Sequence, residues 1–263
     1  MGNIYLPKES KILDVKKHTD IDYTFRMEFS GRVKPGQFFE ISIPKCGEAP
    51  ISVCEIGKGY VDLTIRRVGR VTDVVHSLCK GDRLFMRGPY GNGFDVDLYK
   101  DKELVVAAGG TGTAPVKSII DYFSDNRDEI ADFHVLMGFK SPEDILFKDS
   151  IKKWSRNVDV ILTVDRADEN YHGNVGLITK YIKNIPIKNL NQAQAIVVGP
   201  PMMMKFTIDE FLKRGISEEN IWVSYERKMC CGLGKCGHCR MNDTYICLEG
   251  PVFNYVKAKH MVD

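Results

Sequence analysis

The architecture of this chain is clearest in one stretch near its middle, Leu104-Val105-Val106-Ala107-Ala108-Gly109-Gly110-Thr111-Gly112-Thr113-Ala114-Pro115. Its first five residues form an uninterrupted apolar run, which is typical of a strand that is buried on both faces. The glycines that follow leave backbone amides exposed, and a helix that starts near Pro115 adds the positive end of its dipole, so we expect this loop to bind a phosphate. Pro115 stands where the G-x-G-x-x-G fingerprint has its third glycine, and a plain strand-to-helix turn is the alternative.

Downstream of this loop, strand and helix patterns alternate. Val116, Ile119, Ile120 and Phe123 follow the i, i+3, i+4, i+7 spacing of an amphipathic helix. Buried strands are expected at residues 133–137, 158–164, 195–198 and 221–224, with helices at 142–154 and 202–214. Because strands alternate with helices, residues 100–224 are predicted to form an α/β domain with a doubly wound parallel sheet.

Upstream of the loop, the pattern indicates an all-β domain at residues 1–99. Tyr23, Phe25, Met27 and Phe29 alternate with polar residues, which places the apolar set on one face of a strand. Further short strands are expected at 38–43, 60–65 and 83–87, separated by turns that contain glycine or proline. This spacing favours an antiparallel barrel or sandwich.

A short helix is expected to interrupt these strands at Gly69-Arg70-Val71-Thr72. We expect Thr72 to be its N-cap and Val74, Val75 and Leu78 to face inward. A second phosphate could bind there, although a plain capped helix explains the same residues.

Four cysteines near the C-terminus, Cys231, Cys236, Cys239 and Cys247, have the spacing C-x4-C-x2-C-x7-C. Plant-type [2Fe-2S] clusters use C-x4-C-x2-C with a distant fourth cysteine. Intervening glycines at 232, 234 and 237 would let the loop wrap a cluster with its amides free to donate to sulfur. Residues 225–263 are therefore predicted to be a small [2Fe-2S] module, with a structural zinc site as the alternative because four thiolates also suit tetrahedral Zn²⁺.

Composition narrows the possible partners. The formal net charge is +2, so nothing indicates nucleic-acid binding, and no apolar stretch is long enough for a membrane span. No signal peptide is evident, and we expect a cytoplasmic protein with reduced thiols.

In this order the motifs resemble the ferredoxin-NADP reductase superfamily. Residues 49–53 look like its flavin-binding strand, 69–72 like its flavin pyrophosphate helix, and 88–91 like the turn that closes its barrel. Residues 109–115 match the nicotinamide-nucleotide loop, and Gly199-Pro200-Pro201-Met202 match the late motif that lines the nicotinamide site. With the cysteine cluster added, the chain is similar to the branch of electron-transfer subunits, and it is closest to those that serve anaerobic sulfite reductase.

The resemblance implies an N-terminal Greek-key flavin-binding barrel, an NAD(P)H-dependent oxidoreductase activity and a relay from NADH through FAD to [2Fe-2S]. It implies no catalytic acid or base, since the cofactors carry the chemistry. The implied FAD contacts are Pro50, Ile51, Ser52, Val53, Thr64, Ile65, Arg66, Gly69, Val71 and Thr72. The implied nucleotide contacts are Gly109, Gly110, Thr111, Gly112, Thr113, Pro115, Asp165, Gly199 and Pro200.

The sequence also bears on the choice between NADH and NADPH, and it departs from the superfamily pattern at two positions. Glu143 and Asp144 accompany a lone Lys140, and carboxylates suit a bare ribose, so NADH is favoured over NADPH. Ala49 stands where the superfamily has an arginine for the flavin pyrophosphate, and Arg66, Arg67 or Arg70 could supply that charge. Val198 replaces the cysteine that usually precedes the late Gly-Pro motif.

The implied partner is a separate catalytic redox subunit that receives the electrons. The first expectation is a subunit of an anaerobic, dissimilatory-type sulfite reductase. The alternatives are dihydroorotate dehydrogenase or a hydrogenase. A nucleotide-binding regulatory module with structural zinc is the alternative from a different functional class.

Overall fold

The structure, a computed structural model, describes residues 3–261, which divide into two compact units. One unit contains the chain up to residue 94 together with 225–252, and the other contains 95–224 together with 253–260. The predicted module at 225–263 is thus shared between the two units, because the chain after residue 252 adds a strand to the parallel sheet.

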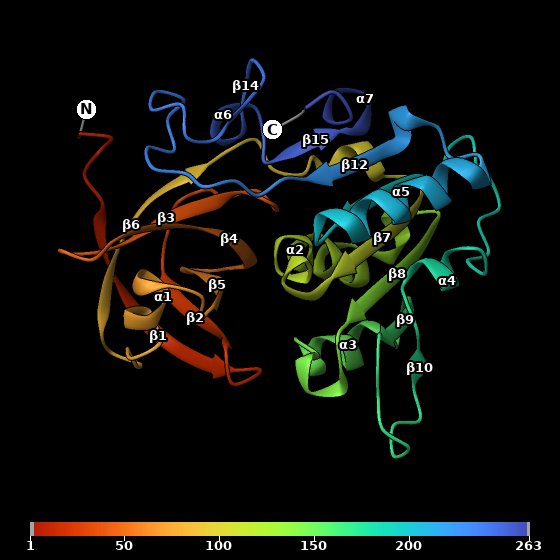
Figure 1. The fold of residues 1–263 in the computed structure, drawn as a ribbon, viewed down its shortest axis with the longest axis horizontal. Coiled ribbons are helices and arrows are strands. Elements are labelled where there is room, and N and C mark those ends of the chain that lie inside the picture. The colour runs from red at the N-terminus through yellow and green to blue at the C-terminus, as the bar shows by residue number, and fades with distance from the viewer. Residues whose placement is uncertain (1–2, 262–263) are drawn as a thin grey trace. The chain divides into compact units, whose positions relative to one another are not determined.

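The first unit is built on a closed antiparallel barrel with the strand order β1-β2-β5-β4-β3-β6 (Figure 1). In this order β2 is followed in space by β5 and not by β3, as in a Greek key. The elements are β1 (Lys8–Lys17), β2 (Asp22–Glu28), β3 (Phe38–Ile43), β4 (Gly47–Gly57), β5 (Tyr60–Arg66), α1 (Arg70–Val75) and β6 (Arg83–Tyr90).

Alternation along the strands fills the barrel. The predicted inward set of β2 is confirmed, since Phe25 and Met27 are fully buried and Tyr23 and Phe29 pack against the same cluster. Cross-strand partners supply the other side of this core, for example Leu63 opposite Phe25. The predicted all-β domain is therefore observed as a barrel and not as a sandwich.

Helix α1 differs in detail from its prediction. Gly69 is the N-cap, and Thr72 lies at the third helical position, where its hydroxyl accepts from the Gly69 amide at 3.0 Å and donates to the Gly69 carbonyl at 2.9 Å. Val75 is buried as expected, but Val74 is 36% exposed. The prediction of Thr72 as N-cap was wrong because threonine can also complete a capping box from inside the helix.

The second unit contains a seven-stranded sheet with the order β10-β9-β8-β7-β11-β12-β15. The five strand pairings from β10 through β12 are all parallel, as predicted. Its strands are β7 (Glu103–Gly109), β8 (Asp132–Phe139), β9 (Asp159–Val164), β10 (Asn174–Val175), β11 (Gln194–Val198), β12 (Ile221–Ser224) and β15 (Val252–Asn254). Its helices are α2 (Thr113–Asp125), α3 (Lys148–Trp154), α4 (Thr179–Ile182), α5 (Pro201–Arg214) and α7 (Tyr255–Ala258), with short 3-10 turns at Val96–Tyr99, Arg127–Glu129 and Glu218–Asn220.

The sheet is doubly wound. From β7 the chain moves through α2 to β8 and through α3 to β9, whereas β11 lies on the other side of β7 and leads through α5 to β12. Right-handed crossovers in opposite directions place the helices on opposite faces, and accordingly α2 contacts α3 while α5 contacts α4. The strand order therefore reverses between β7 and β11.

The predicted helix at 142–154 is interrupted. A 3-10 turn at Pro142–Asp144 is separated from α3 by Ile145, Leu146 and Phe147, and Phe147 has a φ of 52°. All three of these apolar side chains are buried. Three consecutive residues cannot share one face of a helix, so their burial requires an irregular segment.

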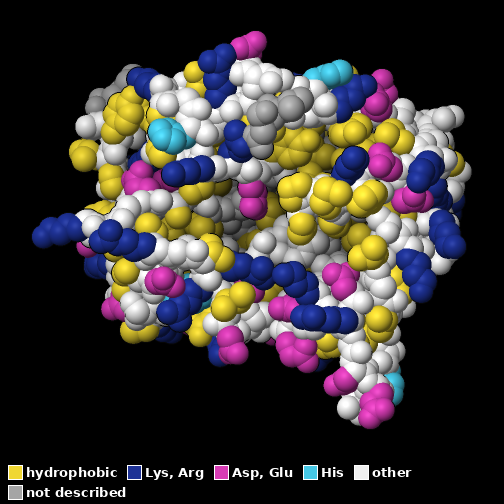
Figure 2. Space-filling view, viewed as in Figure 1, with side chains coloured by type: hydrophobic (Ala, Val, Ile, Leu, Met, Phe, Trp, Pro, Cys, Tyr) yellow, Lys and Arg dark blue, Asp and Glu magenta, His cyan; other side chains and the backbone are white. Residues whose placement is uncertain are grey.

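The cysteine segment contains little regular structure. It has the two-stranded pair β13 (Arg240–Met241) and β14 (Thr244–Tyr245), followed by α6 (Ile246–Glu249). None of the helices in the described part of the chain is long and apolar enough to cross a membrane. On the face seen in Figure 2, basic and acidic side chains are interspersed.

Candidate iron-sulfur, flavin and nucleotide sites

The four predicted cluster ligands are brought together as two pairs. The side chain of Cys236 neighbours that of Cys231, and the side chain of Cys247 neighbours that of Cys239. Cys239 and Cys247 are buried, whereas Cys236 is exposed. A pairwise arrangement suits two iron atoms, each held by two thiolates.

Backbone amides converge on the same sulfur atoms. The amides of Leu233 and Lys235 donate to Cys231 Sγ at 3.3 and 3.4 Å, and the Gly234 amide donates to Cys247 Sγ at 3.1 Å. Gly234 has a φ of 67°, and a Cβ at this position would lie 2.1 Å from Leu248 Cδ1. The loop therefore needs glycine here to turn its amides toward sulfur.

The thiol geometry bears on which metal would fit. Among residues 3–261, no three His, Cys, Asp or Glu side chains lie close enough to hold a single metal ion. A structural zinc ion would require the four thiolates around one point. Burial, together with the hydrogen bond to Cys239, raises the pKa of Cys247 to about 12, so a strong positive charge is needed to bind this residue as thiolate. Four cysteine thiolates are a ligand set that iron-sulfur clusters and structural zinc sites share.

Arg87 ties the cysteine loop to the barrel. Its guanidinium donates to Glu48 through Nε at 3.1 Å and Nη2 at 2.5 Å, to the Cys230 carbonyl at 2.7 Å, and to the Cys231 carbonyl. Burial disfavours the charged form of Glu48, but hydrogen bonds from Arg87 and Ser42 hold the pKa of Glu48 below its usual value. This ion pair is therefore formed at neutral pH.

Glu40 lies beside this ion pair without a partner of its own. It is fully buried, it is the cross-strand neighbour of Arg87 and of Pro50, and neither carboxyl oxygen accepts a hydrogen bond among the described residues. Burial is the largest effect on this carboxyl and, despite the attraction of Arg87, raises its pKa to about 7.

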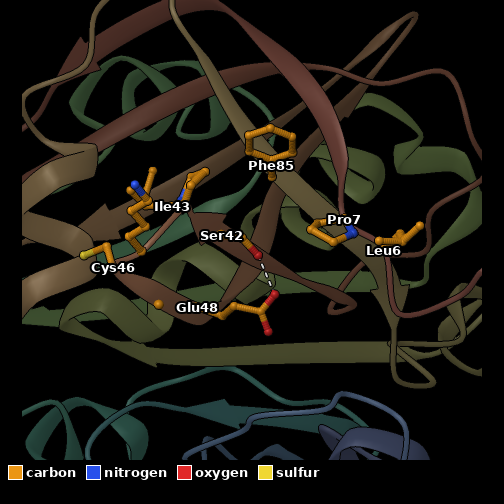
Figure 3. A pocket seen from close by; sticks show the side chains of 10 residues that line it. Leu6, Pro7, Ser42, Ile43, Cys46, Glu48 and Phe85 are labelled. Atoms are coloured by element: carbon orange, nitrogen blue, oxygen red, sulfur yellow. Dashed lines mark hydrogen bonds between the residues drawn. The ribbon is translucent and has the colours of Figure 1, made fainter.

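An open pocket adjoins the same ion pair (Figure 3). Glu48 lies within it and accepts from Ser42 Oγ at 2.5 Å, shown as the dashed line. Phe85, Leu6 and Pro7 supply its apolar side. No predicted cofactor contact lines this pocket.

The predicted flavin contacts on β4 divide between two faces. Ile51 and Val53 pack in the barrel core, so their side chains are unavailable to a cofactor. Pro50 and Ser52 alternate with them and face outward, opposite Glu40 and Phe38 of β3. The outward face of β3 and β4 therefore carries both the proposed flavin residues and the carboxyl of Glu40.

The predicted contacts on β5 already have partners within the barrel domain or its core. Thr64 hydrogen-bonds to Thr24 at 2.8 Å, and Ile65 is buried. Arg66 donates to both carboxyl oxygens of Asp22, at 2.8 and 2.9 Å. Arg66 is thus committed to a neighbouring strand, and we do not retain it as the group that neutralises a pyrophosphate.

The start of α1 offers a different cation. Gly69 is exposed, Val71 packs partly against the core, and Thr72 is occupied by the capping box. Arg67 pairs with Asp73 at 2.8 Å. Arg70 is exposed and forms no ion pair with any described residue, so of the three arginines considered from the sequence it has the most freedom to meet a phosphate.

The nucleotide loop lies where the strand order reverses. Gly109 ends β7, residues 110–112 form a 3-10 turn, and Thr113 begins α2. A Cβ on Gly112 would lie 2.7 Å from Gly199 Cα, and one on Gly109 would lie 3.2 Å from Pro200 Cδ. The loops after β7 and β11 therefore touch, at the crevice where open α/β sheets bind ligands.

Two details of this crevice accord with a phosphate ligand. Gly110 has a φ of 54° and nothing lies within 4 Å of its would-be Cβ, so the backbone is open on that side. The buried hydroxyl of Thr113, in the first turn of α2, lacks a hydrogen-bond partner within residues 3–261. Thr111 is partly exposed in the preceding 3-10 turn, and Pro115 is buried in α2.

The ribose-side residues lie on the same edge of the sheet. Asp165 follows β9 and is exposed, with its amide donating to the Phe139 carbonyl at 2.8 Å. Arg166 donates its amide to Lys140 at 3.1 Å and is also exposed. Arg166 was missed from the sequence, and it adds a cation next to Lys140. The preference for NADH therefore rests on a more balanced set of charges than predicted.

Comparison with known proteins assigns two segments of the chain to domain families. Residues 106–209 match the oxidoreductase NAD-binding domain, and residues 226–259 match the iron-sulfur cluster binding domain of dihydroorotate dehydrogenase B. The structure reported for an NADH-dependent reduced ferredoxin-NADP oxidoreductase has a TM-score of 0.79 at 22% identity, covering 100% of this chain and 91% of that one. A ferredoxin-NADP⁺ reductase from Neisseria gonorrhoeae with bound FAD and NADP has a TM-score of 0.68 at 23% identity, covering 79% and 91%.

Fold and sites together define an oxidoreductase with the ferredoxin-NADP reductase architecture and an added iron-sulfur binding domain. The chain is 38% identical to the sulfhydrogenase 1 gamma subunit of Pyrococcus furiosus, covering 96% of this chain and 92% of the relative. It is 30% identical to a probable dihydroorotate dehydrogenase B (NAD⁺) electron transfer subunit of Thermoplasma volcanium, covering 92% and 86%. It belongs to the family of electron-transfer subunits that includes these two proteins. The expectation of a sulfite reductase partner gains no support from these relatives.

Proposed function

We propose that this chain is the electron-transfer subunit of a multi-subunit oxidoreductase, passing electrons between NADH, FAD and a [2Fe-2S] cluster. The observation that carries the proposal is the arrangement of Cys231 with Cys236 and of Cys239 with Cys247 as two pairs under donating amides. Bound flavin would exchange two electrons with the nucleotide and single electrons with the cluster.

The chain's own residues bind and orient. Backbone amides of Gly110 to Thr113 and the start of α2 would hold the nucleotide pyrophosphate. Pro50 and Ser52 would contact the flavin from the outward face of β4, and Arg70 would neutralise its pyrophosphate. The four cysteines would hold the cluster.

The proposed partner is a hydrogenase-type catalytic subunit. The relative with the higher identity of the two is a sulfhydrogenase subunit. Dihydroorotate dehydrogenase is the second candidate, supported by the relative from Thermoplasma volcanium. Ala49, in place of the arginine expected in the dihydroorotate branch, favours the first.

An anaerobic visible spectrum of the purified protein, with metal analysis, tests the relay. We expect flavin and [2Fe-2S] bands that bleach with NADH, and a slower or incomplete change with NADPH. A colourless protein that contains zinc would refute the relay. Co-purification from the native host, followed by assays for hydrogen, dihydroorotate and sulfite, would then identify the partner.

The nucleotide loop can be tested separately with Gly110→Ala. Alanine is strained at a φ of 54° but meets no neighbouring atom, so packing should survive while the pyrophosphate amides turn away. We expect the KM for NADH to rise about tenfold, equivalent to about 1.4 kcal/mol, with the cluster spectrum unchanged. Gly59→Ala is the matched control, because Gly59 also has a positive φ and open space but lies in a barrel turn. An unchanged KM would show that the loop is only a structural turn.

A further inference from the structure

Arg87 connects parts of the chain that lie far apart in sequence. It is a barrel residue on β6 and only 7% exposed, yet two of its hydrogen-bond acceptors are the carbonyls of Cys230 and Cys231. Its third acceptor is the Glu48 carboxylate on β4, which it binds through two nitrogens. One guanidinium therefore holds the cysteine loop and two barrel strands together.

The shape of arginine matters for this connection. Three acceptors are reached at once by a planar group with donors in a fixed fork, and the ammonium of lysine lacks this geometry. Tyr90 adds to the fit, since its hydroxyl lies 3.3 Å from Arg87 Nη1, and a Cβ on Gly232 would lie 2.8 Å from the Tyr90 ring. The loop packs closely on this side of the barrel.

The charge of Arg87 matters as well. Its hydrogen bond to the Cys231 carbonyl brings a buried positive charge to the peptide unit of a predicted iron ligand. Reduction adds a negative charge to an iron-sulfur cluster, and nearby charges and hydrogen bonds set the potential. A positive charge favours the reduced state, and the carboxylate of Glu48 opposes it.

We propose that Arg87 is a positioning residue for the cluster, and that the Arg87–Glu48 pair sets its reduction potential. This inference rests on the proposed function, because it requires a redox-active cluster at the four cysteines. Arg87 is not a ligand of the metal and does not contact the reacting nucleotide. It acts through the peptide units of Cys230 and Cys231.

Two neutralising substitutions test the charge with opposite signs. Arg87→Gln removes the positive charge but keeps amide donors, and it should lower the potential of the cluster. Glu48→Gln removes the opposing negative charge and should raise it. We expect shifts on the order of tenfold in the one-electron equilibrium, which corresponds to about 59 mV. Arg87→Lys should stay nearer to the wild-type potential even where it loosens the loop.

The measurement is an anaerobic redox titration of the holoprotein followed by electron paramagnetic resonance, with iron and sulfide content determined on each sample. Arg83→Gln is the matched control, since Arg83 lies on the same strand but pairs with Glu9 at the surface, 57% exposed. The control should leave the potential unchanged. If Arg87→Gln fails to fold, Glu48→Gln still tests the sign, because its side chain is 31% exposed.

Opposite shifts with iron retained would support the proposal. Unchanged potentials in variants that keep their iron, or shifts of the same sign in both, would overturn it and reduce Arg87 to a packing role. A wild-type protein without any reducible cluster would instead refute the proposed function itself. The two failures are therefore distinguishable.

Discussion

The two outward faces of the barrel differ in how their buried charged side chains are paired. On the face formed by β2 and β5, each of the two buried carboxylates has an arginine from the opposite strand, Arg26 for Asp62 and Arg66 for Asp22, with both carboxyl oxygens engaged. On the face formed by β3, β4 and β6, Glu40 and Glu48 share the neighbourhood of Arg87, and Arg87 also serves the cysteine loop.

One face therefore pairs its buried charged groups within the barrel, and the other does not. The β2–β5 face satisfies its charges with residues of adjacent strands and needs nothing further. The β3–β4–β6 face depends on a segment that arrives more than a hundred residues later in the chain, and it leaves Glu40 unsatisfied within the described residues. Unpaired buried carboxyls are costly, so their presence marks a face whose other function outweighs stability.

Among the substitutions that test this difference, removal of a proposed metal ligand should have the largest effect. Cys236→Ser should abolish electron delivery to an external one-electron acceptor, with loss of more than a hundredfold in rate, because one thiolate of the relay is missing. NADH-dependent flavin reduction should remain, since the proposed flavin residues on β4 and the nucleotide loop are untouched. Stopped-flow spectra would separate the two steps. Equal failure of flavin reduction, with FAD bound and the fold intact, would show that the relay order is wrong.

A smaller difference is expected from truncating one arginine on each face. Arg87 is buried, so Arg87→Ala removes a packed side chain, leaves Glu48 without its ion-pair partner and frees two carbonyls; we expect a loss of about 3 kcal/mol in the free energy of unfolding. Arg26 is 36% exposed, and Arg26→Ala should cost about 1 kcal/mol. Urea unfolding of both variants checks this order. Equal losses would remove the distinction between the faces.

The smallest effect concerns Glu40 and depends on pH. Its pKa of about 7 in the folded state lies above its ordinary value of 4.5, so the folded chain binds the extra proton. The stability that this proton contributes is complete below pH 4.5 and is lost as the pH rises through 7, by up to roughly 1.4 kcal/mol per pH unit. Glu40→Gln stays neutral, and we expect it to be about 1–2 kcal/mol more stable than the wild type at pH 8 and nearly equal at pH 5.

Unfolding at the two pH values tests this prediction, with Glu48→Gln as the comparison. Glu48 has a lowered pKa because of its partners, so its carboxylate stabilises the fold at neutral pH, and its replacement should be destabilising at pH 8. If Glu40→Gln is also less stable than the wild type at pH 8, the prediction is wrong. Glu40 would then be a charged carboxylate whose hydrogen-bond partners are not among the described contacts.

The sequence alone was enough to predict features whose signal comes from residues close together in the chain. The apolar spacing of Val116, Ile119, Ile120 and Phe123 gave the buried face of α2, and the run from Leu104 gave the central strand. The cysteine spacing indicated four residues that the structure brings close together. These signals work because periodicity and spacing act over a few turns or one loop.

The sequence could not predict contacts that depend on how the strands are aligned with one another. Arg66 was a candidate for the flavin pyrophosphate, but the pairing of β2 with β5 places it directly opposite Asp22. Glu40 resembles any polar residue on the outer side of a strand, and only its neighbours in space reveal that it is fully buried. Arg87 gave no local signal either, because its partners lie on β4 and in the cysteine loop.

The division of the chain into units has a consequence for how the metal centre is assembled. The polypeptide passes between the units near residues 94, 224 and 252, so the cysteine segment is an insertion bounded by two strands of the parallel sheet, β12 and β15. Anchoring both ends of a segment lowers the entropy of the ensemble from which it must fold. Once the sheet forms, the four thiols are confined to a small volume at high local concentration before any iron arrives, which favours capture of the cluster by this chain over competing thiols.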